Sequence, residues 1–65
     1  MFIVNVETYS GYKKEYKLIE PDSARTYFDF CTHAIDTKYA TITDGLTGEL
    51  YAEYFRGTTT FYDWG

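Results

Sequence analysis

The chain has 65 residues, a formal net charge of −4 at pH 7, and 22% aromatic residues. A chain of this length forms a single domain, here residues 1–65, and buries only about 60% of the surface of its unfolded state. Its hydrophobic content of 45% argues against a disordered chain. The acidic balance argues against a basic surface for nucleic acid.

The single cysteine and the first residues indicate the compartment. Because Cys31 has no second cysteine to pair with in the chain, we expect a reducing cytoplasm. The opening MFIVNVETYSG lacks the basic start and the long apolar run of a secretory signal or a membrane span. We therefore expect a complete natural chain that begins at Met1 and has no membrane partner.

Two strands joined by a tight hairpin are predicted at the start of the chain. Residues 2–9 place Phe2, Val4, Val6 and Thr8 on one face, and polar and apolar residues also alternate along residues 12–19. The dipeptide between these runs, SG, suits a two-residue hairpin loop.

An amphipathic helix is predicted next. Pro21 ends the second strand and favours a helix start, and Asp22 or Ser23 is expected to cap the helix. We expect the helix to end near residues 36–38. Apolar positions recur at a spacing of three and four, which predicts a core-facing stripe made of Ala24, Tyr27, Phe28, Cys31, Ala34 and Ile35.

The remaining residues predict two or three further strands. The segments YATIT and ELYAEYF are separated by DGLTG, a strong turn signal, and Arg56-Gly57 precedes a possible fifth strand, TTTFYDW. The order is therefore ββαββ or ββαβββ. Strands grouped around one helix indicate an α+β fold, an antiparallel sheet of four to five strands with the helix packed on one face.

No motif for catalysis or metal binding is found. Cys31 and His33 lie two residues apart, and two adjacent ligands fall short of a zinc site. The carboxylates of Glu49 and Glu53 are expected on one strand face that meets solvent, with no cleft to separate their pKa values. We expect no enzymatic activity, no metal and no cofactor.

Lysines and tyrosines alternate in the second predicted strand. Such residues can bind single-stranded nucleic acid through phosphate contacts and stacking, and lysines also protect an exposed edge strand from unwanted pairing. The acidic chain favours the second interpretation, so we expect no direct nucleic-acid partner. The first interpretation, a nucleic-acid module, remains an alternative based on Tyr12, Lys13, Lys14, Tyr16 and Lys17.

The C-terminal part of the chain combines acids with aromatic rings. Residues 36–65 carry a net charge of −3, against −1 for residues 1–35. If Leu50, Ala52 and Tyr54 face the helix, then Glu49, Tyr51, Glu53 and Phe55 face outward; the other register exposes Tyr54. Tyrosine and tryptophan are enriched at interface hot spots, and carboxylates steer basic partners. The predicted partner-binding residues are Asp44, Glu49, Tyr51, Glu53, Tyr54, Asp63 and Trp64.

The aromatic residues have a second interpretation, in which the rings shield the sheet and stabilise it through cross-strand pairs. A structural or assembly subunit, associating through an edge strand or the uncovered sheet face, also remains an alternative. In solution we expect a monomer or a weak homodimer.

In overall character, a tiny, acidic and aromatic chain without catalytic groups, the sequence resembles small phage-encoded inhibitors of host defence of the anti-CRISPR and anti-restriction type. The resemblance implies a location in the cytoplasm of a host bacterial cell. It also implies a basic protein partner, such as a CRISPR effector subunit or another nucleic-acid enzyme. Steric occlusion or partial DNA mimicry is then the expected mechanism of inhibition.

Overall fold

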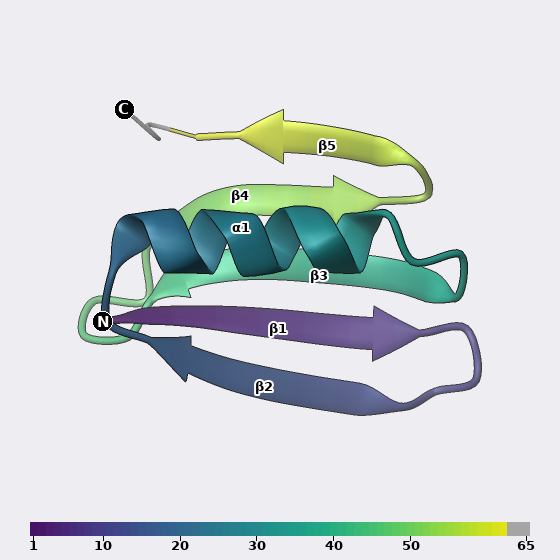
Figure 1. Ribbon diagram of the computed structural model, residues 1–65, viewed down its shortest axis with the longest axis horizontal. Coiled ribbons are helices and arrows are strands. Elements are labelled where there is room, and N and C mark those ends of the chain that lie inside the picture. The colour runs from purple at the N-terminus through teal and green to yellow at the C-terminus, as the bar shows by residue number, and fades with distance from the viewer. Residues whose placement is uncertain (63–65) are drawn as a thin grey trace.

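A computed structural model of the chain describes residues 1–62 and shows one helix lying across one sheet (Figure 1). The elements are β1 (Phe2–Thr8), β2 (Lys13–Leu18), α1 (Pro21–Thr32), β3 (Thr37–Asp44), β4 (Leu50–Phe55) and β5 (Thr58–Phe61). This ββαβββ order confirms the predicted α+β fold and the fifth strand over residues 58–61. The predicted continuation of that strand through Asp63 and Trp64 lies outside the described residues.

The five strands form one antiparallel sheet in the order β2-β1-β3-β4-β5, so that β2 and β5 are its two edges. The turn between β4 and β5 consists of Arg56 and Gly57, with φ angles of 50° and 85°. Two positive φ angles give a hairpin loop whose twist matches that of the flanking strands. This short turn fixes the pairing of Phe55 with Thr58 and of Glu53 with Thr60.

The helix begins and ends earlier than the sequence pattern predicts. Glu20 is the N-cap residue and makes no side-chain capping bond, so the predicted capping role of Asp22 or Ser23 is wrong. The reason is that Pro21, with its fixed φ, occupies the first helical position. The helix ends at Thr32, where the backbone N–H of His33 donates to the carbonyls of Asp29 and Cys31.

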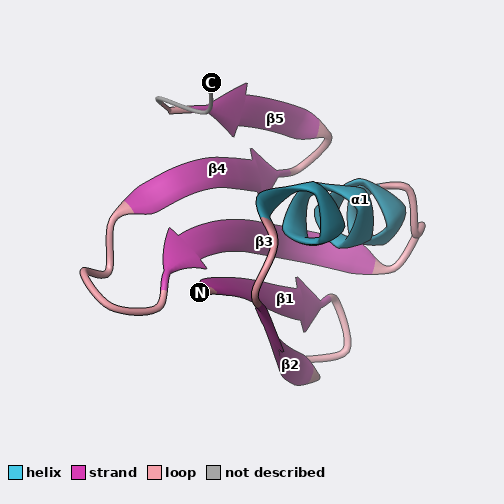
Figure 2. Ribbon diagram, turned by 60° about the vertical axis from the view of Figure 1, so that its left-hand side comes forward, coloured by secondary structure: helices cyan, strands magenta, loops and turns pink. Residues whose placement is uncertain are grey.

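The core lies between α1 and one face of the sheet, as the turned view shows (Figure 2). Phe28 is fully buried, and the helical residues Ala24 and Cys31 are buried beside it. Small side chains on both surfaces let the helix approach the sheet closely, which favours dense packing. The buried residues that the sheet contributes to this apolar core are Val4, Val6, Ala40, Ile42 and Ala52.

The predicted core stripe is correct for Ala24, Phe28 and Cys31. It is wrong for Ile35, whose side chain is 98% exposed. Because α1 stops at Thr32, Ile35 belongs to the connection that leads into β3 and no longer follows the helical repeat.

Two phenylalanines of α1 offer a matched test of this packing. Phe28 is completely buried, whereas Phe30 is 75% exposed. The Phe28→Ala substitution should lower the free energy of unfolding by about 3–5 kcal/mol, since it leaves a cavity in the core. The Phe30→Ala substitution should change it by less than about 1 kcal/mol. Urea unfolding followed by circular dichroism measures both, and equal losses would contradict this assignment of the core.

Candidate functional site

The face of the sheet opposite α1 has no helix over it in the described part of the chain (Figure 2). Side chains alternate between the two faces, and Ala52 is buried in the core under the helix, so its neighbour Glu53 points to the uncovered face. In β5, the Phe61 ring lies 6.2 Å from the Phe28 ring, which places Phe61 on the helix side. Thr60 and Tyr62 therefore share the uncovered face with Glu53.

A carboxylate surrounded by aromatic rings lies on this face. The hydroxyl of Tyr39 donates to Glu53 Oε2 at 2.8 Å, and the hydroxyl of Tyr62 donates to Glu53 Oε1 at 3.4 Å. The rings of Tyr39 and Phe55 meet edge to face with their centroids 5.9 Å apart. We refer to Tyr39, Glu53, Phe55 and Tyr62 as the Glu53 cluster.

Strand pairing explains how these residues meet. Tyr39 of β3 pairs directly with Phe55 of β4, and Glu53 pairs with Thr41 on one side and Thr60 on the other. Neither residue paired with Glu53 is basic, so the carboxylate is bordered by hydroxyls and rings. The rigid sheet holds this arrangement without help from a loop, which favours binding because little side-chain freedom is left to lose.

The electrostatics of the Glu53 cluster follow from its hydrogen bonds. The bond to Glu53 raises the pKa of Tyr39 above its usual value, and burial raises that pKa further. The tyrosine therefore stays a neutral donor to the carboxylate at physiological pH. A carboxylate beside aromatic rings is suited to a Lys ammonium or an Arg guanidinium, through a charge-assisted hydrogen bond and cation–π attraction.

The structure separates the residues predicted to bind a partner. Glu53 lies on the uncovered face, whereas Tyr54 is half-buried and packs against the core on the helix side. The predicted outward position of Tyr51 is wrong, because its ring packs against the core and lies 5.7 Å from the Phe2 ring. A shift in strand register at Ile42/Thr43 of β3 disturbs the alternation of β4 at this residue. Asp63 and Trp64 lie outside the described residues.

Asp44 belongs to the loop between β3 and β4. Its Oδ1 accepts hydrogen bonds from the backbone N–H groups of Leu46 at 2.7 Å and Thr47 at 3.2 Å. Its Oδ2 accepts a bond from the Tyr51 hydroxyl at 2.9 Å. These bonds, first the one from Leu46, lower the pKa of Asp44. The carboxylate thus organises the loop, and Glu49 follows as an exposed residue at the loop's end.

Four carboxylates collect at the end of the molecule that holds the start of β1, the start of α1 and the β3–β4 loop (Figure 1). Glu20 and Asp22 flank the first turn of α1, where negative charge is favourable to the helix dipole. Asp44 is engaged in its loop, which leaves Glu49 as the carboxylate here whose position the fold does not explain. Sequence analysis did not anticipate that Glu20 and Asp22 join this end.

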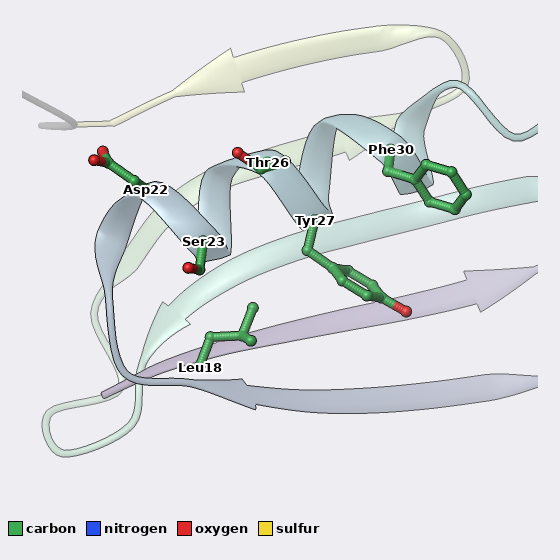
Figure 3. Close-up of a pocket in the computed structure, with 6 residues that line it drawn as sticks. All are labelled: Leu18, Asp22, Ser23, Thr26, Tyr27 and Phe30. Atoms are coloured by element: carbon green, nitrogen blue, oxygen red, sulfur yellow. The ribbon is translucent and has the colours of Figure 1, made fainter.

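An open groove of about 510 Å³ lies between α1 and β2 (Figure 3). A neighbouring hollow of about 150 Å³ shares the rings of Tyr27 and Phe30 with it. Tyr16 and Tyr27 have ring centroids 4.4 Å apart, and a hydrogen bond from Tyr16 together with burial raises the pKa of Tyr27 to about 12. Such a groove can accept an apolar group. The groove is lined by Leu18, Asp22, Ser23, Thr26, Tyr27 and Phe30.

The basic residues of the first hairpin are divided between two faces. Lys14 belongs to the helix side with its partner Val6, and its Nζ lies 5.4 Å from the centre of the Tyr12 ring. Lys13 and Lys17 pair with Glu7 and Ile3 and point to the other side. The hairpin therefore does not gather its lysines into one basic groove, which weakens the nucleic-acid interpretation.

Within residues 1–62, no group of three or more His, Cys, Asp or Glu side chains is placed to hold a metal ion. The helix in the described part of the chain is neither long nor apolar enough to span a membrane. Comparison of the chain with protein-family models, with curated proteins and with solved structures gave no match. The candidate site therefore rests on geometry and charge alone.

Tyr39 was missed by sequence analysis although a signal for it exists. The DGLTG turn joins two strands as a hairpin, and counting back from that turn brings Tyr39 close to Phe55. The irregularity at Ile42/Thr43 shifts the register by one residue, so the count alone gives the wrong partner. The hydrogen bond between Tyr39 and Glu53 became visible only with the strands in place.

The carboxylate of Asp44 predicts a pH dependence of stability. Because folding lowers its pKa below the usual value near 3.8, the group contributes stability above that value. This contribution is lost as the pH falls through the lowered pKa. We expect Asp44→Asn to lower the melting temperature at neutral pH and to converge with the wild type near about pH 2. An Asp36→Asn variant, altered at an exposed residue, is the control; parallel melting curves for Asp44→Asn and the wild type would contradict the role of Asp44.

The hydrogen bond within the Glu53 cluster predicts a shift in tyrosine titration. Since the bond to Glu53 is the largest cause of the raised pKa of Tyr39, Glu53→Gln should move that pKa down toward its usual value. An NMR titration of protein with ¹³C-labelled tyrosine rings measures this change, with Tyr9 as the internal control. An unchanged Tyr39 titration would show that the two side chains are not bonded in solution.

Proposed function

We propose that this chain is a protein-binding inhibitor without enzymatic activity. Its target is a basic, nucleic-acid-handling protein of a bacterial host, such as a CRISPR effector subunit. The observation that supports this most is the Glu53 carboxylate, which lies on the uncovered face of the sheet between two tyrosine hydroxyls. The chain blocks nucleic acid by covering the basic surface to which it binds, in the cytoplasm of that host.

The chemistry of the cluster favours a cationic side chain. A lysine or arginine of the partner gains a charge-assisted hydrogen bond to Glu53 and contacts the edges and faces of Tyr39, Phe55 and Tyr62. Tyrosine-rich, partly desolvated patches of this kind are typical of interface hot spots. The net charge of −4 adds a long-range attraction that raises the association rate with a basic partner.

Steric occlusion is better supported than DNA mimicry. A mimic needs several carboxylates that are free to take the place of phosphates. Asp44 spends its oxygens on its own loop and on Tyr51. Glu53 and Glu49 remain as candidates for contacts with basic side chains, on different parts of the surface.

Capture from nuclease-treated bacterial lysate with tagged protein tests this proposal. The wild type should recover a basic nucleic-acid-binding protein, and Glu53→Lys should reduce the recovery at least about tenfold because a buried contact to a charged partner is reversed. Glu15→Lys is the matched control, since Glu15 lies on the same face but on the edge strand β2, two strands away from β4. It should change the recovery by less than about twofold.

Inhibition is the second readout. Added protein should release nucleic acid from the recovered partner at close to one copy for each binding site. Equal recovery by the wild type and by Glu53→Lys would contradict the proposed surface. Recovery that depends on intact nucleic acid would favour the lysine–tyrosine hairpin instead.

A further inference from the structure

The edge strand β5 differs from the edge strand β2 in a way that bears on binding. β2 carries Lys13, Lys14 and Lys17, and lysines on an edge discourage pairing with another strand. β5 reads TTTF, is exposed along its whole length and has no charged residue. Among the described residues β5 is the last strand on its side of the sheet (Figure 1). Its sequence therefore leaves one edge of the sheet without the protection that the other edge has.

The backbone groups that β5 offers follow from its pairing with β4. The N–H of Tyr62 donates to the carbonyl of Tyr51 at 2.7 Å, so Tyr62 directs its backbone toward β4. In an antiparallel pair, alternate residues turn both backbone groups to the same neighbour. Thr60 and Thr58 therefore also face β4, and Thr59 and Phe61 direct their N–H and C=O groups to the outer edge.

We propose that β5 accepts an extended segment of a basic partner as a sixth strand of the sheet. This inference rests on the proposed function and names how the partner reaches the Glu53 cluster. Added strands of this kind gain affinity from main-chain hydrogen bonds and specificity from alternate side chains. The outer groups of Thr59 and Phe61 supply the main-chain bonds here.

The side chains beside β5 specify the chemistry of the incoming segment. On the uncovered face, its residue opposite Thr60 lies two strand spacings, about 10 Å, from Glu53 on β4. Thr60 is small, and a lysine or arginine can extend across it to the carboxylate. The segment therefore carries a basic residue at this position.

The other side of the incoming segment meets the helix face of the sheet. There the Phe61 ring is 40% exposed and the guanidinium of Arg25 lies 4.6 Å from its centre. A basic residue on this side would approach Arg25, whereas an apolar one covers the ring. The favoured segment thus alternates, with a basic residue on one side and apolar residues on the other.

A second copy of this chain fits the edge less well. Two β5 strands related by a two-fold axis place threonine, not a basic residue, opposite Thr60 or its neighbours. Each copy also brings a net charge of −4. A contact along a four-residue strand alone falls well short of the about 1,600 Å² that stable interfaces bury. A basic segment gains from the charge that repels a second copy.

An NMR titration of ¹⁵N-labelled protein tests the proposal. The probe is the capped peptide threonine–valine–lysine–valine–threonine, and its matched control has glutamate in place of lysine. With the lysine peptide, the N–H signals of Thr59 and Phe61 should move downfield and exchange more slowly with solvent. Those of Thr58 and Thr60, which already bond to β4, should move much less. The lysine peptide should bind at least about fivefold more tightly than the glutamate peptide, and Glu53→Gln should remove most of that difference.

Three results would overturn the proposal. The first is a set of shifts confined to β2 or to the groove beside α1. The second is equal affinity for the two peptides. The third is protection of Thr59 and Phe61 that grows with protein concentration when no peptide is present, which would assign the edge to a second copy.

The variant Thr59→Pro separates this inference from the proposed function. Proline removes an outward N–H, and the melting temperature checks that the sheet persists. If Thr59→Pro captures the basic protein as well as the wild type while Glu53→Lys does not, the inhibitor surface is supported and strand addition is overturned. If the lysine peptide binds β5 but no basic protein is captured, strand addition is supported and the proposed function fails.

Discussion

The whole structure depends on one helix covering a sheet that is wider than the helix. A helix is about 10 Å across, and neighbouring strands are about 4.8 Å apart, so α1 shields roughly two strand spacings. Phe28, seated over Ala40, Ile42 and Ala52, fixes where that shield lies. What remains uncovered follows from this: the far face of the sheet, both edge strands and the groove beside β2. Each candidate for function in this chain is a part of the surface that a single helix cannot reach.

The uncovered face explains why the chain uses tyrosine so heavily. Tyrosine shields the sheet with its ring and keeps a hydroxyl for a partner or for solvent. Around Glu53 these two interpretations of the aromatic residues, shielding and binding, coincide. The Tyr39 hydroxyl satisfies the carboxylate within the free protein, and the same rings line the approach of a cationic side chain. A stable free surface and a binding surface are therefore compatible in the same cluster.

The sequence predicted the strands, the helix and the short turns because each depends on neighbours along the chain. Periodicity identified Phe28 and Cys31 as core residues, and Arg56-Gly57 as a tight turn. It placed Tyr51 on the wrong face and Ile35 in the core because a register shift and an early helix end are decided by packing across the sheet. The same limit applies to the site: Glu53 was identified from its charge and its neighbours, whereas Tyr39, fourteen residues away, joins it only through strand pairing.

The measurement that tests this account most directly is amide hydrogen exchange, on the protein alone and bound to the basic protein that it captures. The account predicts that binding slows exchange in β4 and β5 and around Tyr39, and leaves α1 and β2 unchanged. Slower exchange confined to the groove between α1 and β2, or to the β1–β2 hairpin, would show that the partner binds a different surface and would contradict the role given to the Glu53 cluster.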